Sequence, residues 1–170
     1  MKKYWQIPYA GMLVTFFALL GINAALAADH QKHVTDVIQQ DERLTTLAKA
    51  ISDAGLGDAL KGDGPFTVFA PNNKAFEQLP RGTLDDLMKD KAKLAKVLKY
   101  HVIDGQKVML EDKTKGKQAL KTLEGSPVEL TKPKKKRFFV NKSLVLHKDD
   151  GHALNGVVHI IDRVLLPPGV

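Results

Sequence analysis

The sequence has 170 residues, a formal net charge of +7 and no cysteine. Its length fits one domain of ordinary size, and the missing cysteine excludes disulfides, a cysteine nucleophile and a lipid attached through cysteine. The excess of Lys and Arg favours acidic partners such as anionic glycans or lipid head groups.

The N-terminus has the pattern of a secretory signal peptide. Two lysines precede an uncharged, largely apolar run of eleven residues, Met12–Ile22, and small residues stand at the −3 and −1 positions of a cleavage site after Ala27. Cleavage after Ala28 is the alternative. The run is shorter than the about 20 apolar residues that span a bilayer, which disfavours an uncleaved anchor. We predict a signal peptide over residues 1–27 and an exported domain, periplasmic or secreted, over residues 28–170, with no transmembrane segment after cleavage.

The first half of this domain is predicted to be mainly helical. Apolar residues at helical spacing predict a helical block over residues 34–51, with Asp41 as an N-cap inside it. The run Phe66–Ala70 is apolar on both faces, which is typical of a central strand. Asn72 or Asn73 is expected to cap the short helix that follows.

Two more helices are expected before the spacing of the apolar residues changes from helical to alternating. Thr83 and Asp86 have the spacing of a capping box at the start of the first helix. The second begins near Lys91 and carries an apolar stripe that ends at His101, with lysines away from the stripe. One face of this helix is therefore expected to pack on the core.

From Gly105 onward apolar residues recur with a period of two, and turn residues separate the runs. The last run, Val157–Leu166, is again apolar on both faces. Helices followed by a mainly antiparallel sheet predict an α+β domain, with the Phe66–Ala70 strand beside the last strand.

Three segments together resemble the fasciclin domain family. They are Phe66–Phe76 (FTVFAPNNKAF), Leu98–Ile103 (LKYHVI) and Asn155–Pro167 (NGVVHIIDRVLLP), which are similar to the family's first, central and C-terminal signatures. The resemblance spans nearly all of the chain after the signal peptide. It implies a wedge in which two short sheets form a β-sandwich-like core with helices wrapped on one side. It also implies a secreted or surface-exposed module for adhesion, matrix contact or host association, with no common enzymatic activity.

Two positions depart from the family's pattern. Adhesive animal members carry an Asp-Ile pair before the C-terminal Asn-Gly; here Asp150 matches the aspartate, but Gly151 stands in place of isoleucine. This departure disfavours integrin-like adhesion. The family often has Asn-Gly where this chain has Asn141-Lys142, and because lysine disfavours the positive φ of a type I′ turn, a longer loop is expected there.

The polar residues of the matching motifs are Tyr100, His101, Asn155, Gly156 and His159. Tyr100 and His101 end a helical stripe and are expected to be buried, each with a hydrogen-bonding partner, although a contact surface is the alternative. His159 lies within an apolar strand and is expected to be buried as well, within reach of the Tyr-His pair. These residues are interpreted as structural.

The strongest surface feature is a cluster of five cations within six residues: Lys132, Lys134, Lys135, Lys136 and Arg137. The proline among them indicates a turn between strands, and a solvated hairpin tip is the simplest interpretation. The functional alternative is a contact for an envelope or matrix component, either a protein or an anionic glycan or lipid. Nucleic acid is not expected as a partner of an exported protein. At least one of the following residues, Phe138 and Phe139, is expected in the core.

No catalytic constellation is found. None of the serines lies in a Gly-x-Ser-x-Gly elbow, there is no phosphate-binding or dinucleotide-binding loop, and two adjacent loop aspartates are poorly placed for acid-base catalysis. We predict a non-enzymatic binding module without a cofactor. The alternative is a periplasmic metal or small-ligand binder that uses His147 and His152 with Asp149 or Asp150, but this spacing sets no tetrahedral site.

Overall fold

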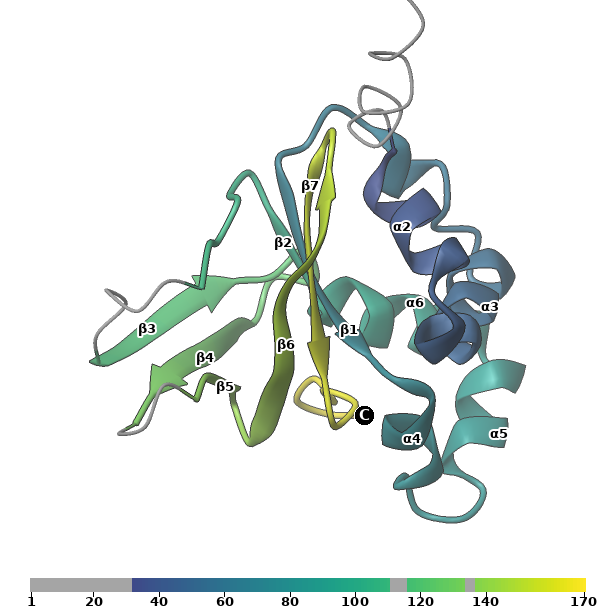
Figure 1. The fold of residues 1–170 in the computed structure, drawn as a ribbon. Coiled ribbons are helices and arrows are strands. Elements are labelled where there is room, and N and C mark those ends of the chain that lie inside the picture. Colours follow the sequence, from purple (N-terminus) through teal and green to yellow (C-terminus); the bar gives the residue numbers. More distant parts are fainter. Residues whose placement is uncertain (1–31, 111–115, 134–136) are drawn as a thin grey trace, which may run out of the picture.

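The computed structural model describes residues 32–110, 116–133 and 137–170, with the side chains of 147–150 excepted. Its helices all lie on one side of the central strands (Figure 1). The α-helices are α2 (Val34–Gln40), α3 (Thr45–Asp53), α4 (Asn73–Glu77), α5 (Thr83–Lys89) and α6 (Lys91–Tyr100), with 3-10 turns η2 (Glu42–Leu44) and η3 (Ala59–Lys61). The strands are β1 (Phe66–Pro71), β2 (Val102–Asp104), β3 (Gly116–Lys121), β4 (Pro127–Lys132), β5 (Phe139–Val140), β6 (Ser143–Ala153) and β7 (Gly156–Ile161).

The strand order is β2-β1-β7-β6-β5-β4-β3. β1 runs parallel to β7, with Phe66 opposite Gly156, while the other neighbouring strands are antiparallel. The expected pairing of the early strand with the last one is confirmed. β7 ends at Ile161 and not at Leu166, because the Asp162 carboxylate accepts the Leu144 N–H (2.7 Å) in place of a backbone carbonyl.

The sheet curls until its two edges meet. Ile103 of β2 forms an antiparallel bridge with Thr122, just after β3, and the Leu123 N–H donates to the Val102 carbonyl (2.7 Å). The two short sheets that were expected are therefore two halves of one curled sheet, joined through β6. The α+β class and the sandwich-like core with helices on one side are confirmed.

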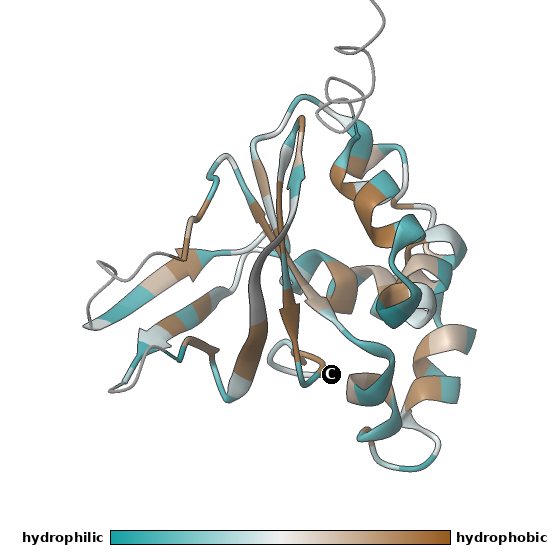
Figure 2. Ribbon diagram, in the orientation of Figure 1, coloured by the Kyte–Doolittle hydropathy of each residue, from teal (hydrophilic) through white to brown (hydrophobic). Residues whose placement is uncertain are grey.

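The alternating side chains of β1 and β7 divide the core in two. Val68 and Ile160 point to the helices, whereas Phe69 and Ile161 point into the curl of the sheet. Both strands are buried at every position, and they are brown along most of their length in Figure 2. Most apolar side chains of this central strand pair therefore pack on one of two apolar layers.

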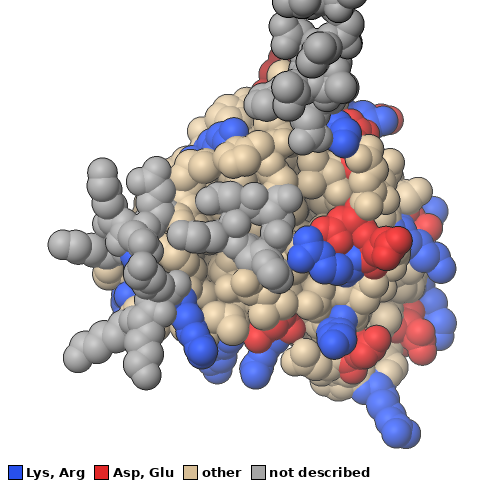
Figure 3. Space-filling view, viewed as in Figure 1, with Lys and Arg blue, Asp and Glu red and all other residues tan. Residues whose placement is uncertain are grey.

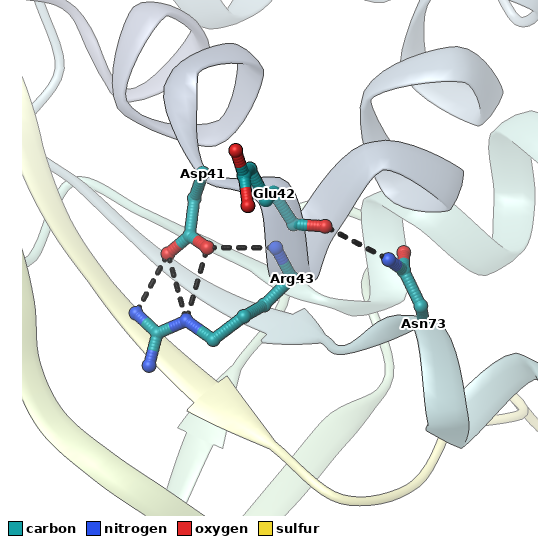
Figure 4. A network of polar contacts seen from close by, with 4 residues as sticks. All are labelled: Asp41, Glu42, Arg43 and Asn73. Carbon is teal, nitrogen blue, oxygen red and sulfur yellow. Dashed lines mark hydrogen bonds and ion pairs between the residues drawn. The ribbon is translucent and has the colours of Figure 1, made fainter.

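Helix caps join segments that are distant in sequence. Asn72 caps α4 through the Ala75 N–H (2.8 Å), as one of the two expected alternatives. Asn73 reaches the start of α3 instead: its side chain donates to the Glu42 carbonyl (2.9 Å) and accepts from the Thr46 N–H (3.0 Å). Figure 4 shows this amide meeting the turn between α2 and α3.

The same turn contains the predicted cap at Asp41. Its carboxylate accepts the Arg43 N–H (2.9 Å) and pairs with the Arg43 guanidinium (2.7 Å), as Figure 4 shows. The capping box predicted at Thr83 is wrong, because Thr83 is the first residue of α5 and the cap position is Gly82, in a left-handed conformation (φ 86°).

Candidate functional site

Asn155 holds three distant segments together. Its side-chain oxygen accepts the Val34 N–H (3.0 Å), and its amide nitrogen donates to the carbonyls of Leu60 (2.8 Å) and Gly62 (2.7 Å). Its own carbonyl accepts the Phe66 N–H (2.8 Å). Asn155 is 4% exposed, and its side-chain bonds to Val34 and Leu60 are buried, while the bond to Gly62 is partly buried. These bonds tie α2, η3 and β1 to the turn before β7.

Gly156 allows the close approach of β1 and α2 to this turn. A Cβ atom at this position would lie 2.3 Å from the Phe66 carbonyl oxygen and 2.8 Å from a Val34 methyl group. Backbone cannot move out of the way as a flexible side chain can. Both residues of the Asn-Gly pair thus serve contacts between secondary-structure elements within the domain.

His101 connects the end of α6 to the C-terminal segment. Its Nε2 accepts the Leu165 N–H (2.9 Å), so Nδ1 carries the proton and donates to the Val97 carbonyl (2.8 Å). Burial lowers the pKa of His101 to about 4, although the bond to Val97 opposes this shift. The imidazole is therefore neutral at physiological pH.

Tyr100 and His159 are also buried. The Tyr100 hydroxyl donates to the Pro127 carbonyl (3.2 Å) and accepts from the Asn141 side chain (3.2 Å). His159 lies with its Nε2 2.8 Å from the Val108 carbonyl and its ring 5.8 Å from the ring of Phe69. The expected burial of all three motif side chains is confirmed, and each has a polar contact within the domain.

The turn between β5 and β6 corrects the expected longer loop. Val140 pairs directly with Ser143, so only Asn141 and Lys142 connect the strands. Asn141 takes a left-handed conformation (φ 54°) and Lys142 does not. The turn is stable because the Asn141 side chain accepts the Glu129 N–H (2.9 Å), a partner that no local sequence pattern indicated.

The basic cluster lies at the connection between β4 and β5. Lys132 ends β4 with its ammonium 5.0 Å from the centre of the Phe138 ring, and Arg137 is exposed. Residues 134–136 lie outside the described residues. Phe138 is buried and Phe139 half-buried, so the expectation of a core phenylalanine is confirmed. In Figure 3, Lys and Arg side chains lie at the lower end of the sheet and also over the helices, where most of the visible Asp and Glu side chains lie as well.

Only part of the site considered for metal binding is described. His152 is exposed on β6, and the side chains of His147, Asp149 and Asp150 are outside those described. Among the described side chains, no three His, Asp or Glu residues form a group that could hold a metal ion.

The sequence profile of the fasciclin domain matches residues 42–167. The chain belongs to the fasciclin domain family. It is 41% identical to protein sll1483 of Synechocystis over 84% of this chain and 77% of the relative. It is 34% identical to the cell surface glycolipoprotein MPB83 of Mycobacterium bovis over 85% of this chain and 64% of that protein. The transforming growth factor-beta-induced protein ig-h3 of Sus scrofa is 41% identical, but the match covers only 19% of it.

The fold of this fasciclin domain is also found among solved structures. The FAS1 domain pair from the insect cell adhesion molecule fasciclin I superposes with a TM-score of 0.66 at 19% identity, over 81% of this chain and 52% of that one. In the part of the chain that the structure describes, no helix is long and apolar enough to cross a membrane. The predicted signal peptide, residues 1–27, lies outside that part.

Gly151 explains one departure from the pattern of adhesive fasciclin domains. A Cβ atom here would lie 2.3 Å from a methyl group of Val37 in α2, so the place of the isoleucine side chain is taken by α2. An isoleucine side chain at this position would therefore require Val37 to move.

We expect Gly151→Ala to lower the free energy of unfolding by about 2 kcal/mol, because overpacking costs about 1–3 kcal/mol. Val37→Ala should relieve the collision, so the double variant should lose less than the two single variants added together. Urea unfolding measures all three. Gly57→Ala is the control, since a Cβ there meets no atom within 4 Å. Simple additivity would show that Val37 does not limit residue 151.

Proposed function

We propose that this fasciclin domain is an exported, non-enzymatic binding module that contacts an anionic glycan or lipid of the cell envelope or matrix through the β4–β5 connection. One observation carries the proposal. The buried polar side chains of the family motifs form hydrogen bonds within the domain. The basic cluster instead lies in the connection between the ends of β4 and β5. The name of one relative, a cell surface glycolipoprotein, supports a role at surfaces.

The geometry of the connection supports a role in binding anions. β4 ends at Lys132 and β5 begins at Phe139, so all five cations fall at or beyond the end of the paired strands. This end of the sheet lies away from the helices (Figure 1). Cations so close together in the sequence repel one another, and a polyanion would relieve that repulsion while it forms charge-assisted hydrogen bonds.

The export part of the proposal rests on the N-terminal sequence. A charged start, an apolar run and small residues before Ala27 are the features that a signal peptidase substrate needs. Either compartment, periplasm or exterior, would expose the cluster to anionic glycans and to phospholipid head groups.

Charge reversal tests the binding part. The variant with Lys134→Glu, Lys135→Glu and Lys136→Glu should bind envelope fractions at least about a hundredfold more weakly, since each basic residue near an anionic surface contributes about 1 kcal/mol. Binding of the unaltered protein should also weaken with salt. Sedimentation with isolated envelopes measures both effects.

The matched control reverses three exposed lysines on the helical side, Lys49, Lys61 and Lys74, with the same change in net charge. This control should retain most of the binding. Equal losses in the two variants would mean that only overall charge matters and would refute the assignment. If binding survives charge reversal at Lys134, Lys135 and Lys136 but disappears when a chelator is added, the metal-binding alternative is supported instead.

A further inference from the structure

The outer face of β5 and β6 carries apolar side chains that the core does not use. Phe138 and Val140 are buried inside the curl, so Phe139 between them faces outward. Ser143 and Val145 are buried too, so Leu144 also faces outward. Both outward side chains are only half-buried.

Strand register places these side chains next to each other. Phe139 is directly opposite Leu144 on β6 and opposite Thr131 on β4, which is in turn opposite Lys117 on β3. Opposite residues have Cβ atoms about 5 Å apart, so Phe139 and Leu144 are in contact range. Leu146, also apolar and 42% exposed, lies two residues further along β6, where the pairing with β7 shifts register.

Cations border this apolar area. Arg137 lies two residues before Phe139, and Lys142 lies two residues before Leu144; both are exposed. Two carboxylates of neighbouring segments are engaged: Glu129 pairs with Lys117 (3.2 Å), and Asp162 accepts the Leu144 N–H (2.7 Å). We call Arg137, Phe139, Lys142, Leu144 and Leu146 the Phe139 face. It is apolar at its centre and basic at its rim.

We propose that the Phe139 face binds the surface of an anionic phospholipid bilayer, with Phe139, Leu144 and Leu146 among the head groups and the cations on lipid phosphates. This inference rests on the proposed function and selects its ligand. A soluble acidic glycan would engage the cations but leave the apolar side chains in water. A second copy of the chain would bring the two basic rims together. A bilayer interface suits both the apolar centre and the basic rim of the Phe139 face, since aromatic and aliphatic side chains enter it and anionic head groups attract cations.

A tryptophan reporter tests the insertion. Tryptophan occurs once in the chain, at Trp5, so in a Trp5→Phe background Phe139→Trp supplies a single reporter. The protein recovered after export is mixed with vesicles of phosphatidylcholine and phosphatidylglycerol in equal parts, whose acyl chains carry bromine. Emission at position 139 should shift to the blue and fall by at least about half, because bromine quenches only a ring that enters the bilayer. Leu154→Trp, at the exposed β6–β7 turn, should be unaffected.

Each outcome has a definite meaning. Loss of vesicle binding, by at least about tenfold, in Phe139→Ser and Leu146→Ser, with unchanged binding to soluble dextran sulfate, supports the bilayer. Circular dichroism confirms that both variants fold. Two outcomes overturn the bilayer inference. One is vesicle binding without quenching at position 139. The other is displacement of the protein by dextran sulfate while neither serine variant changes vesicle binding. Both outcomes leave the proposed contact through the basic cluster intact. If reversal of the three hairpin lysines has no effect on either ligand, the proposed function itself fails.

Discussion

Replacing Asn155 with alanine is expected to lower the free energy of unfolding by about 4 kcal/mol, more than any surface substitution in the chain. The variant leaves the Val34 N–H and the carbonyls of Leu60 and Gly62 without their partner. A buried polar group that loses its hydrogen bond costs about 1–3 kcal/mol, and the 4% exposure of this side chain leaves little room for water to replace it. Urea unfolding followed by circular dichroism measures the loss.

Asn73→Ala is the matched control. That amide also makes three hydrogen bonds, to Glu42, Thr45 and Thr46, but two of them are exposed to solvent. Water can replace them, so a loss of about 1 kcal/mol is expected, as for other helix caps. Similar losses in the two variants would show that burial does not determine the cost and would contradict the role given to Asn155.

Acid is expected to destabilise the domain through His101. Its pKa is about 4 in the folded protein against 6.5 ordinarily, so between these values the unfolded chain binds a proton that the folded chain does not. The free energy of unfolding should therefore fall as the pH drops from 6.5 towards 4, by about 3 kcal/mol in total, and rise again as the pH increases. Structurally, a proton on Nε2 would oppose the Leu165 N–H, donor against donor.

Unfolding by urea at several pH values, compared between proteins, isolates this contribution. His101→Gln keeps an amide that can donate and accept but does not titrate, so its stability should depend less on pH in this range. Leu98→Ala in α6 is destabilised without loss of the imidazole and should keep the full dependence. If His101→Gln and the unaltered protein lose stability in parallel, another group is responsible.

Patterns within a few residues predicted much of this fold. β1 and β7 could be paired from sequence because both are apolar on both faces, and only a strand covered on both sides has that composition. The stripe of α6 predicted the buried face that carries Leu94 and Leu98. The burial expected of Tyr100 and His101 followed from their place at the end of that stripe.

Contacts between segments that are distant in the sequence could not be predicted from such local patterns. The partners of Asn155 lie in α2 and near η3, and the partner of Asn141 lies on β4, so no local spacing reveals them. The two-residue turn at Asn141 was missed because lysine in second place disfavours a type I′ turn, yet only the asparagine needs a positive φ. The collision at Gly151 likewise depends on how α2 docks.

The parallel pairing of β1 with β7 has a consequence for how the chain matures. Among the strands of the described residues, β1 is the first to leave a ribosome or a translocation channel, and its partner is the last. Until Gly156–Ile161 has emerged, one hydrogen-bonding edge of β1 lacks its neighbouring strand. We therefore expect the central strand pair to form only after nearly the whole chain has emerged.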